Sequence, residues 1–267
     1  MNMLPETDRR FATTLARGLS VLRAFRPSDD GLGNAEIAER TGLPKSTVSR
    51  LTFTLQSLGY LSRARHGDRY RPGPALLAQG NVAAASIGFL ELAGPILRRL
   101  ANETRTLSLM AVRDRDRLLL AKAWRPEGMS SIWLEVGHRL PIVGSSSGHC
   151  YLASLPDETL PAVTAEMAEA RGSNPDTVAR VRNDAYAQLV ARGYAVCDPA
   201  DYFTPGIHAV SVPFQPRDLT EPVVFSCGAT PADLSLARIE AEVGPALRAA
   251  VRELETALGQ GPTALKR

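Results

Sequence analysis

Five consecutive residues, Gly144-Ser-Ser-Ser-Gly148, carry the hydroxyls and glycines that a binding or catalytic loop needs. They lead from a strand-like stretch into a predicted helix. A loop at a helix N-terminus offers backbone N–H groups and hydroxyls to an anion, so it suits a carboxylate. The same residues spell G-x-S-x-G, the pattern of a nucleophile elbow, with Ser146 at its centre. A third interpretation is that Ser145, Ser146 and Ser147 only cap the helix.

The hydrolase alternative can draw on further residues. Asp198 or Asp201, and then His208, follow Ser146 in the chain order of α/β-hydrolases. That fold needs several strand–helix units around the elbow, however, and the strands predicted here come largely as hairpins. A Gly-rich oxyanion segment is also missing. We therefore expect a binding loop and no enzyme.

Residues 35–51 read Ala-Glu-Ile-Ala-Glu-Arg-Thr-Gly-Leu-Pro-Lys-Ser-Thr-Val-Ser-Arg-Leu and predict a helix-turn-helix. Two crossing helices need a small residue where they touch, and Ala38 supplies it. The chain turns sharply four positions later, which suits Gly42, and the branched Val48 would lock the crossing. A helical hairpin with an incidentally charged outer face is the simpler alternative.

The second helix of this motif would present side chains that bond phosphates and base edges in a major groove. These are Lys45, Ser46, Thr47, Ser49 and Arg50. A β-hairpin follows and would hold a basic wing against the DNA backbone, with Arg63, Arg65, Arg69 and Arg71. Residues 1–74 hold 12 Lys and Arg against 7 Asp and Glu, a net of +5, while the remaining residues hold 19 against 21, a net of −2. The basic excess therefore lies where a polyanion would bind.

Hydrophobic spacing predicts the elements that position these side chains. The first quarter of the chain predicts helices at residues 16–25, 35–41 and 45–58 and strands at 60–65 and 69–72. Asn34 would cap the second helix, and Gly59 would end the third. We expect the first helix to bury Leu15, Leu19, Leu22 and Phe25, and the third to bury Val48, Leu51, Leu55 and Leu58. Helices at 75–85 and 90–104 follow.

Beyond residue 104 the pattern is mixed. Strand-like runs cover residues 106–113 and 117–124, with a third around 132–134. Helices are predicted at 148–155, 157–170 and 175–192, strands at 194–197, 207–214 and 222–228, and a last amphipathic helix at 231–258. The expected fold class is α+β, with an N-terminal winged helix-turn-helix and a C-terminal domain built on an antiparallel sheet.

The chain resembles the IclR family of bacterial regulators over residues 14–258, with the landmarks in the family's order. The resemblance rests on Leu15-Ala-Arg-Gly-Leu-Ser-Val-Leu-Arg-Ala-Phe25, the helix-turn-helix, Leu58-Gly-Tyr-Leu, Tyr70-Arg-Pro-Gly-Pro-Ala-Leu-Leu, Val136-Gly-His-Arg-Leu-Pro141, residues 145–155 and Arg192-Gly-Tyr194. It implies a GAF-like α/β effector-binding domain, homodimers that often pair into tetramers, and control of a nearby catabolic operon.

The resemblance also implies an effector pocket. One wall would be the loop with Ser145, Ser146 and Ser147, and the other walls would come from Asp198, Ile207, Ala209, Ser226 and Cys227. Two departures from the family pattern bear on its chemistry, because an acidic run is replaced by Cys197-Asp-Pro-Ala-Asp201 and Gly-Lys-Ala by Gly148-His149-Cys150. We expect a small carboxylic acid as effector. A DNA-binding module without any ligand is the remaining alternative.

The expected layout is an arm at residues 1–13, the DNA-binding domain at 14–74, a linker helix at 75–94, the effector domain at 95–258 and a tail at 259–267. No apolar run approaches the ~20 residues that span a bilayer, and the first ten residues are polar, which favours a cytoplasmic protein without membrane contact. Cys150, Cys197 and Cys227 stand far apart, so we expect buried thiols and no structural zinc. The expected partners are operator DNA, the carboxylate effector and a second copy of the chain, with no cofactor and no metal.

Overall fold

The computed structural model of the chain describes residues 10–65, 68–128 and 132–265. It divides into two compact units, an N-terminal unit up to Ile87 and a C-terminal unit from Gly88 onward. In the described residues no single helix is long and apolar enough to cross a membrane, although the bent pair Pro74–Ala85 and Leu90–Thr104 together meets the criteria of length and composition.

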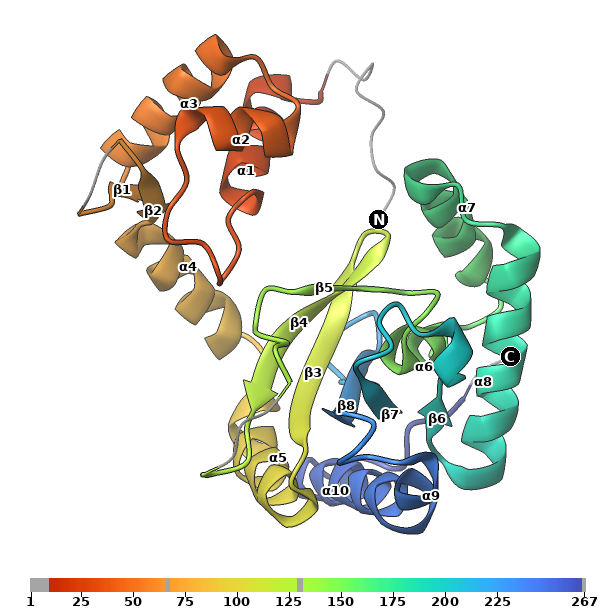
Figure 1. The fold of residues 1–267 in the computed structure, drawn as a ribbon. Helices are drawn as coiled ribbons and strands as arrows, with labels where there is room; N and C mark the ends of the chain where they lie inside the picture. Colours follow the sequence, from red (N-terminus) through yellow and green to blue (C-terminus); the bar gives the residue numbers. More distant parts are fainter. Residues whose placement is uncertain (1–9, 66–67, 129–131, 266–267) are drawn as a thin grey trace. The chain divides into compact units, whose positions relative to one another are not determined.

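The described part of the N-terminal unit consists of helices with a small antiparallel hairpin at their edge (Figure 1). In chain order the elements are α1 (Thr13–Arg23), α2 (Asn34–Thr41), α3 (Lys45–Ser57), β1 (Leu61–Arg63), β2 (Tyr70–Pro72) and α4 (Pro74–Ala85). The hairpin pairs Leu61 with Pro72 and Arg63 with Tyr70. The predicted winged helix-turn-helix is therefore confirmed.

The turn between α2 and α3 depends on Gly42. This residue adopts a left-handed conformation with φ 69°, and its N–H donates to the Ala38 carbonyl at 2.9 Å. The start of α2 differs from the prediction, because Gly33 and not Asn34 is the N-cap residue. The Glu36 carboxylate accepts from the Gly33 N–H at 2.8 Å, while Asn34 accepts from the Thr52 hydroxyl of α3 at 3.0 Å.

The buried face of α1 also differs from the prediction. Val48 of α3 is fully buried as expected, but α1 buries Gly18 and Val21, while Leu15 is 62% and Leu19 51% exposed. A Cβ at Gly18 would lie 3.9 Å from Leu51 on α3, an ordinary packing distance. The helix therefore turns Gly18 and Val21, and not the two leucines, toward the core.

The buried face of α3 is likewise shifted. Thr52 is buried, Leu51 and Leu55 pack only at the edge of the core, and Leu58 is 62% exposed. The helix ends at Ser57, so Leu58 lies outside the helical repeat that predicted its burial. The core of the unit is small and is closed by Leu61 and Tyr70 of the hairpin.

The C-terminal unit is built on a six-stranded sheet in the order β5-β4-β3-β8-β7-β6. The strands are β3 (Leu107–Asp114), β4 (Arg117–Trp124), β5 (Arg139–Pro141), β6 (Ala195–Val196), β7 (His208–Phe214) and β8 (Val223–Ala229). All neighbouring pairs are antiparallel, which confirms the predicted sheet type.

Helices cover both faces of this sheet (Figure 1). One face carries α5 (Leu90–Thr104) and α10 (Gly244–Ala257), which lie side by side. The other face carries α6 (Ser146–Ser154), with α7 (Leu160–Arg171) and α8 (Pro175–Arg192) outside it. Short helical turns lie at η1 (Pro199–Asp201), α9 (Leu236–Arg238) and η2 (Ile239–Val243).

Strand alternation separates two cores in this unit, because successive side chains of a strand point to opposite faces. Phe225 of β8 packs against Phe89 and Phe214 on the α5 side, with ring centroids 6.4 and 5.9 Å away. The preceding residue, Val224, belongs to the core beneath α6. One face of β8 therefore packs on the α5 side of the sheet, and the other faces α6.

Two predicted elements of this unit are wrong. Residues 132–134 form no strand, because the Arg125 guanidinium donates to the carbonyls of Ile132 and Leu134 at 3.0 and 2.7 Å and so takes the place of a neighbouring strand. The sheet edge is β5 instead. The last helix does not begin at 231 but at Leu236, where the Ser235 hydroxyl accepts from the Arg238 N–H at 3.2 Å.

Candidate functional site

The outer face of α3 is polar and exposed. Lys45, Ser46, Ser49 and Arg50 are exposed and Thr47 is half-buried. Among the described residues, the Lys45 ammonium and the Arg50 guanidinium have no partner. These side chains can therefore bind phosphates or base edges, as in a helix that enters a major groove.

The predicted wing residues fall into two groups. Arg65 is exposed and has no partner in the described part of the chain, so it is available to DNA. Arg63 forms an ion pair with Asp68 at 2.5 Å and lies over the Tyr70 ring. Because both of these groups are exposed, this ion pair is weak and can open to a phosphate.

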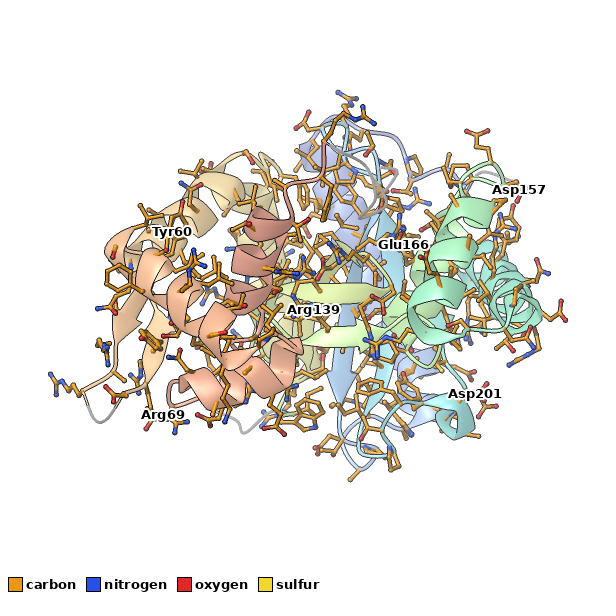
Figure 2. All side chains as sticks on the ribbon, turned by 90° about the horizontal axis from the view of Figure 1, so that it is seen from above. Tyr60, Arg69, Arg139, Asp157, Glu166 and Asp201 are labelled. Atoms are coloured by element: carbon orange, nitrogen blue, oxygen red, sulfur yellow. The ribbon has the colours of Figure 1, made fainter. Side chains whose placement is uncertain are left out.

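Arg69, labelled in Figure 2, forms its hydrogen bonds with other residues of the N-terminal unit. Its guanidinium donates to the Gly31 carbonyl at 3.1 and 2.8 Å and to the Glu36 carboxylate at 2.8 Å. The Gly33 N–H and this guanidinium together lower the pKa of Glu36. Arg69 thus ties the wing to the start of α2, which positions the helix-turn-helix.

A second constellation lies at the N-terminus of α6 in the C-terminal unit. Gly144 adopts φ 100°, a conformation that favours glycine, and a Cβ at Gly148 would lie 2.0 Å from the Ile142 carbonyl oxygen. Between the glycines, the Ser145 hydroxyl accepts from the Gly148 N–H at 3.1 Å and donates to the Pro141 carbonyl at 2.6 Å. The capping interpretation therefore holds for Ser145.

Ser146 and Ser147 do not cap the helix but point to other segments. The Ser146 hydroxyl donates to the Ala209 carbonyl at 2.6 Å, lies 2.6 Å from the Tyr202 hydroxyl and accepts from the Cys197 N–H at 3.0 Å. All these contacts join α6 to residues at least 51 positions later. They bring together two of the predicted effector residues, Ser146 and Ala209.

A chain of hydroxyls continues from Ser147 into the sheet. The Ser147 and Ser226 hydroxyls are 2.9 Å apart, and the Ser226 and Ser211 hydroxyls are 2.7 Å apart. All three serines are buried. Hydroxyls can reorient to donate or accept, so this chain can adjust to a polar ligand.

The remaining predicted effector residues are placed differently. Asp198 is exposed, and its carboxylate accepts from the Ala200 N–H at 2.9 Å, which caps η1; the exposed Asp201 on the same turn is labelled in Figure 2. Ile207 is buried in the core beneath α6. Cys227 lies on the opposite face of β8 from Ser226, 3.5 Å from the Ser108 hydroxyl. We call the buried Ser146, Ser147, Ser211 and Ser226 the serine cluster. The structure does not bring Cys227 to this cluster.

Two neutral groups flank the cluster. The His149 Nε2 atom accepts from the Gly144 N–H at 3.3 Å and lies 3.7 Å from the Cys197 sulfur. Burial lowers the pKa of His149 to about 4 and raises the pKa of Cys197 to about 12. At neutral pH the site therefore holds no imidazolium and no thiolate.

The contacts of Ser146 exclude the hydrolase alternative. A serine nucleophile needs a histidine within hydrogen-bond reach. His149 contacts Gly144 and Cys197, and the His208 ring is 2.9 Å from the Leu234 carbonyl, so neither contacts Ser146. The described residues also contain no group of three or more His, Cys, Asp or Glu that could hold a metal ion.

Three residues that contact the predicted effector serines were not predicted from the sequence, namely Cys197, Tyr202 and Ser211. Ser211 gives a signal that could have found it, because it is a lone hydroxyl inside an apolar strand, as is Ser226. Buried hydroxyls need partners, so two such strands predict a shared polar site. Tyr202 gives no such signal, because it follows the short turn η1 in an irregular segment.

Family comparison identifies a domain in each of the two units. Residues 14–65 match the IclR helix-turn-helix domain, and residues 82–256 match the C-terminal domain of the bacterial transcriptional regulator IclR. The chain is 27% identical to the HTH-type transcriptional regulator TsaQ1/TsaQ2 of Comamonas testosteroni over 95% of this chain and 91% of that protein. It is 34% identical to the Pca regulon regulatory protein of Pseudomonas putida over 57% of this chain and 52% of that protein.

Solved structures share the fold over nearly the whole chain. The crystal structure of an IclR family transcriptional regulator from Brucella abortus has a TM-score of 0.75 and 32% identity, covering 94% of this chain and 95% of that one. An IclR homologue from Microbacterium hydrocarbonoxydans, crystallised in complex with 4-hydroxybenzoate, has a TM-score of 0.69 and 22% identity, covering 92% and 99%. The chain therefore belongs to the IclR family of DNA-binding transcriptional regulators, in which a C-terminal domain binds an effector and no enzyme activity is involved.

Proposed function

We propose that this regulator binds a small organic acid at the N-terminus of α6 and that the acid changes its affinity for operator DNA. The controlled genes are those of a catabolic operon for that acid. The proposal rests on the donors that the serine cluster presents, and on the resemblance of the whole chain to regulators of this type.

The observation that carries the proposal is a pair of backbone donors. The N–H groups of Ser146 and Ser147 stand at the first two positions of α6, where no intrahelical acceptor exists, and no described residue accepts from them. Both residues are buried, and a buried N–H without an acceptor is costly. A carboxylate accepts hydrogen bonds without donating any, so it matches two such donors at the positive end of a helix.

The local charge supports an acid held by hydrogen bonds. The described residues that contact Ser146 and Ser147 include neither a cation nor a carboxylate. Attraction therefore comes from the aligned donors of the helix and not from an ion pair. The homologue from Microbacterium hydrocarbonoxydans was solved in complex with 4-hydroxybenzoate, an aromatic acid, which supports an acid as the ligand here.

On the DNA side, we propose that Lys45, Ser46, Thr47, Ser49 and Arg50 contact the operator and that Arg63 and Arg65 contact its backbone. The binding species is a homodimer, and two such dimers can pair into a tetramer. In support, α4 buries none of its twelve residues although most are apolar, and Leu77 and Val82 are 68% and 66% exposed. A second copy of the chain would cover these side chains.

The experiment is a calorimetric titration of the full-length protein with a panel of carboxylic acids that includes 4-hydroxybenzoate. A matched variant, Ser146→Leu with Ser147→Leu, fills the space in front of the two donors. We expect at least one acid to bind the wild type and to lose its heat of binding in the variant. An inducer that proves cationic, or that binds the variant as tightly as the wild type, would exclude the proposal.

A further inference from the structure

The Tyr202 hydroxyl contacts the serine cluster through Ser146. It lies 2.6 Å from the Ser146 hydroxyl, donates to the Ala209 carbonyl at 2.8 Å and accepts from the Ala209 N–H at 2.7 Å. One phenolic group thus satisfies both the donor and the acceptor of a strand residue. It also contacts Ser146, whose hydroxyl donates to the same Ala209 carbonyl.

The backbone of β7 explains why a hydroxyl is needed there. The neighbouring strand β6 contains only Ala195 and Val196, and its pairing ends at Val210, so Ala209 has no strand partner on that side. Without a substitute, the N–H of Ala209 would lack a hydrogen bond, and its C=O would keep only the Ser146 hydroxyl as a donor. Tyr202 takes the place of the missing strand residue.

Tyr202 can leave this position without opening a core. Its side chain is partly exposed, and it belongs to neither of the hydrophobic cores described above. It follows the short turn η1, and the next residue, Phe203, donates its N–H to the Gly144 carbonyl at 2.9 Å. Tyr202 is therefore joined, through the next residue, to the loop that begins α6.

We propose that Tyr202 is a built-in competitor for the effector, and that the ligand which displaces it is a 2-hydroxy acid. The proposal rests on the function proposed above, namely an acid at the N-terminus of α6. A group that takes the place of the phenol accepts from the Ala209 N–H and lies against the Ala209 carbonyl oxygen. A hydroxyl can donate to that oxygen, whereas a carboxylate only accepts and would place two acceptors together.

The geometry also places the acid and the hydroxyl close together. The N–H that would bind the carboxylate and the hydroxyl that touches Tyr202 both belong to Ser146. A ligand that replaces the phenol and reaches this N–H must therefore carry its hydroxyl next to its carboxylate. Burial raises the pKa of the Tyr202 hydroxyl, so the phenol stays protonated and keeps its donor at neutral pH.

The test compares acids that differ only by this hydroxyl. Lactate and propionate form one pair, and mandelate and phenylacetate form the other. Each is titrated calorimetrically into the full-length wild type and into Tyr202→Phe, which removes the competing hydroxyl and keeps the ring. Tyr194→Phe is the matched control, because it removes a phenolic group of the same unit whose oxygen is 3.5 Å from the Glu240 carbonyl.

If Tyr202 competes, the hydroxy acids bind Tyr202→Phe at least about tenfold more tightly than the wild type, since a competitor held by hydrogen bonds reduces the population of the open site. Their hydroxyl-free counterparts gain less, and Tyr194→Phe resembles the wild type. Thermal unfolding of each variant verifies that it is folded.

The other outcomes separate the two proposals. If all four acids bind the wild type and Tyr202→Phe equally, the acid site stands and the role of Tyr202 is wrong. If the hydroxy acids bind Tyr202→Phe more weakly, the phenol supports the site and does not compete for it, which also overturns the inference. If no acid binds either protein, both the acid site and the competitor are excluded.

Discussion

The His149 ring nitrogen Nε2 lies 3.7 Å from the Cys197 sulfur in the interior of the C-terminal unit. In a catalytic pair this contact would join an imidazolium and a thiolate. Here burial acts on both groups in the opposite sense, because it favours the neutral form of each. The contact is therefore a packing contact beside the proposed effector site. The burial of His149 makes the stability of the unit depend on pH.

We expect acid to destabilise the protein through His149. Its pKa is lowered to about 4 in the folded state, against 6.5 for an unperturbed imidazole, mainly by desolvation. Between pH 4 and 6.5 the imidazole of His149 is therefore protonated in the unfolded chain and neutral in the folded one. The stabilisation is fully present above pH 6.5 and is lost as the pH falls toward 4, by up to about 3 kcal/mol.

Urea unfolding at several pH values measures this dependence. His149→Gln keeps an acceptor for the Gly144 N–H but cannot titrate, so its free energy of unfolding should vary less over the same pH range. An identical pH dependence in both proteins would show that other groups cause the acid sensitivity.

The three cysteine thiols should react slowly in the native protein. Cys150, Cys197 and Cys227 are free and buried, and burial raises the pKa of each. Because the thiolate is the reactive form, a disulfide reagent such as DTNB should modify them only when the unit opens. Fast modification of any of them before addition of denaturant would contradict the buried placement.

The sequence located the two constellations but not all of their members. Ala38, Gly42 and Val48 predicted the helix-turn-helix because the residues that shape it are close in the chain. The glycines around Ser146 likewise predicted the start of α6. Tyr202 reaches Ser146 across 56 positions through an irregular segment, and no local pattern encodes that contact.

Faces of elements were predicted less well than the elements themselves. Ser226 and Cys227 were assigned to one pocket, although adjacent strand residues point to opposite faces and the structure separates them. Leu15 and Leu19 were expected in a core because they are apolar and helically spaced. Instead, α1 turns Gly18 and Val21 toward the core, and apolar spacing alone does not reveal which face of a helix is buried.

Gly148 should not tolerate a side chain. The added Cβ of Gly148→Ala would lie 2.0 Å from the Ile142 carbonyl oxygen, so the loop before α6 would have to move. We expect a loss of more than about 2 kcal/mol in the free energy of unfolding, which is typical of overpacking at a buried backbone. Gly94→Ala in α5 is the control, since its Cβ meets nothing within 4 Å. It should be neutral or stabilising by up to about 1 kcal/mol. Equal effects of the two variants in denaturant unfolding would contradict this account of the loop.

The arginines of the N-terminal unit should separate into three kinds in DNA binding. Arg50→Ala should cost about 1–3 kcal/mol and relax the preference at one base pair, if it reads a base edge. Arg65→Ala should weaken binding to all sequences alike. Arg69→Ala should lower the melting temperature of the N-terminal unit, because it removes the hydrogen bonds to Gly31. Fluorescence anisotropy with selected and scrambled duplexes, together with calorimetric melting, distinguishes the three. If Arg50→Ala weakened binding equally on all sequences, Arg50 would contact the DNA backbone and not a base edge.

Binding to DNA should also fall steeply with salt. If each protomer of a dimer neutralises about four phosphates, the log–log slope of affinity against salt is roughly −7. The measurement is an anisotropy titration between low and physiological salt. A slope near zero would exclude the phosphate contacts assigned to α3 and the wing.

The most direct test of the account is the operator affinity of the wild type and of the variant with Ser146→Leu and Ser147→Leu, each with and without the acid that binds best in calorimetry. The operator is a duplex selected from a random pool by the wild-type protein. Coupling between effector and DNA should shift the wild-type affinity about 5- to 150-fold. The variant should bind the operator as tightly as the ligand-free wild type and give no response to the acid. An unchanged response in the variant, or no response in the wild type, would contradict an effector site at the N-terminus of α6.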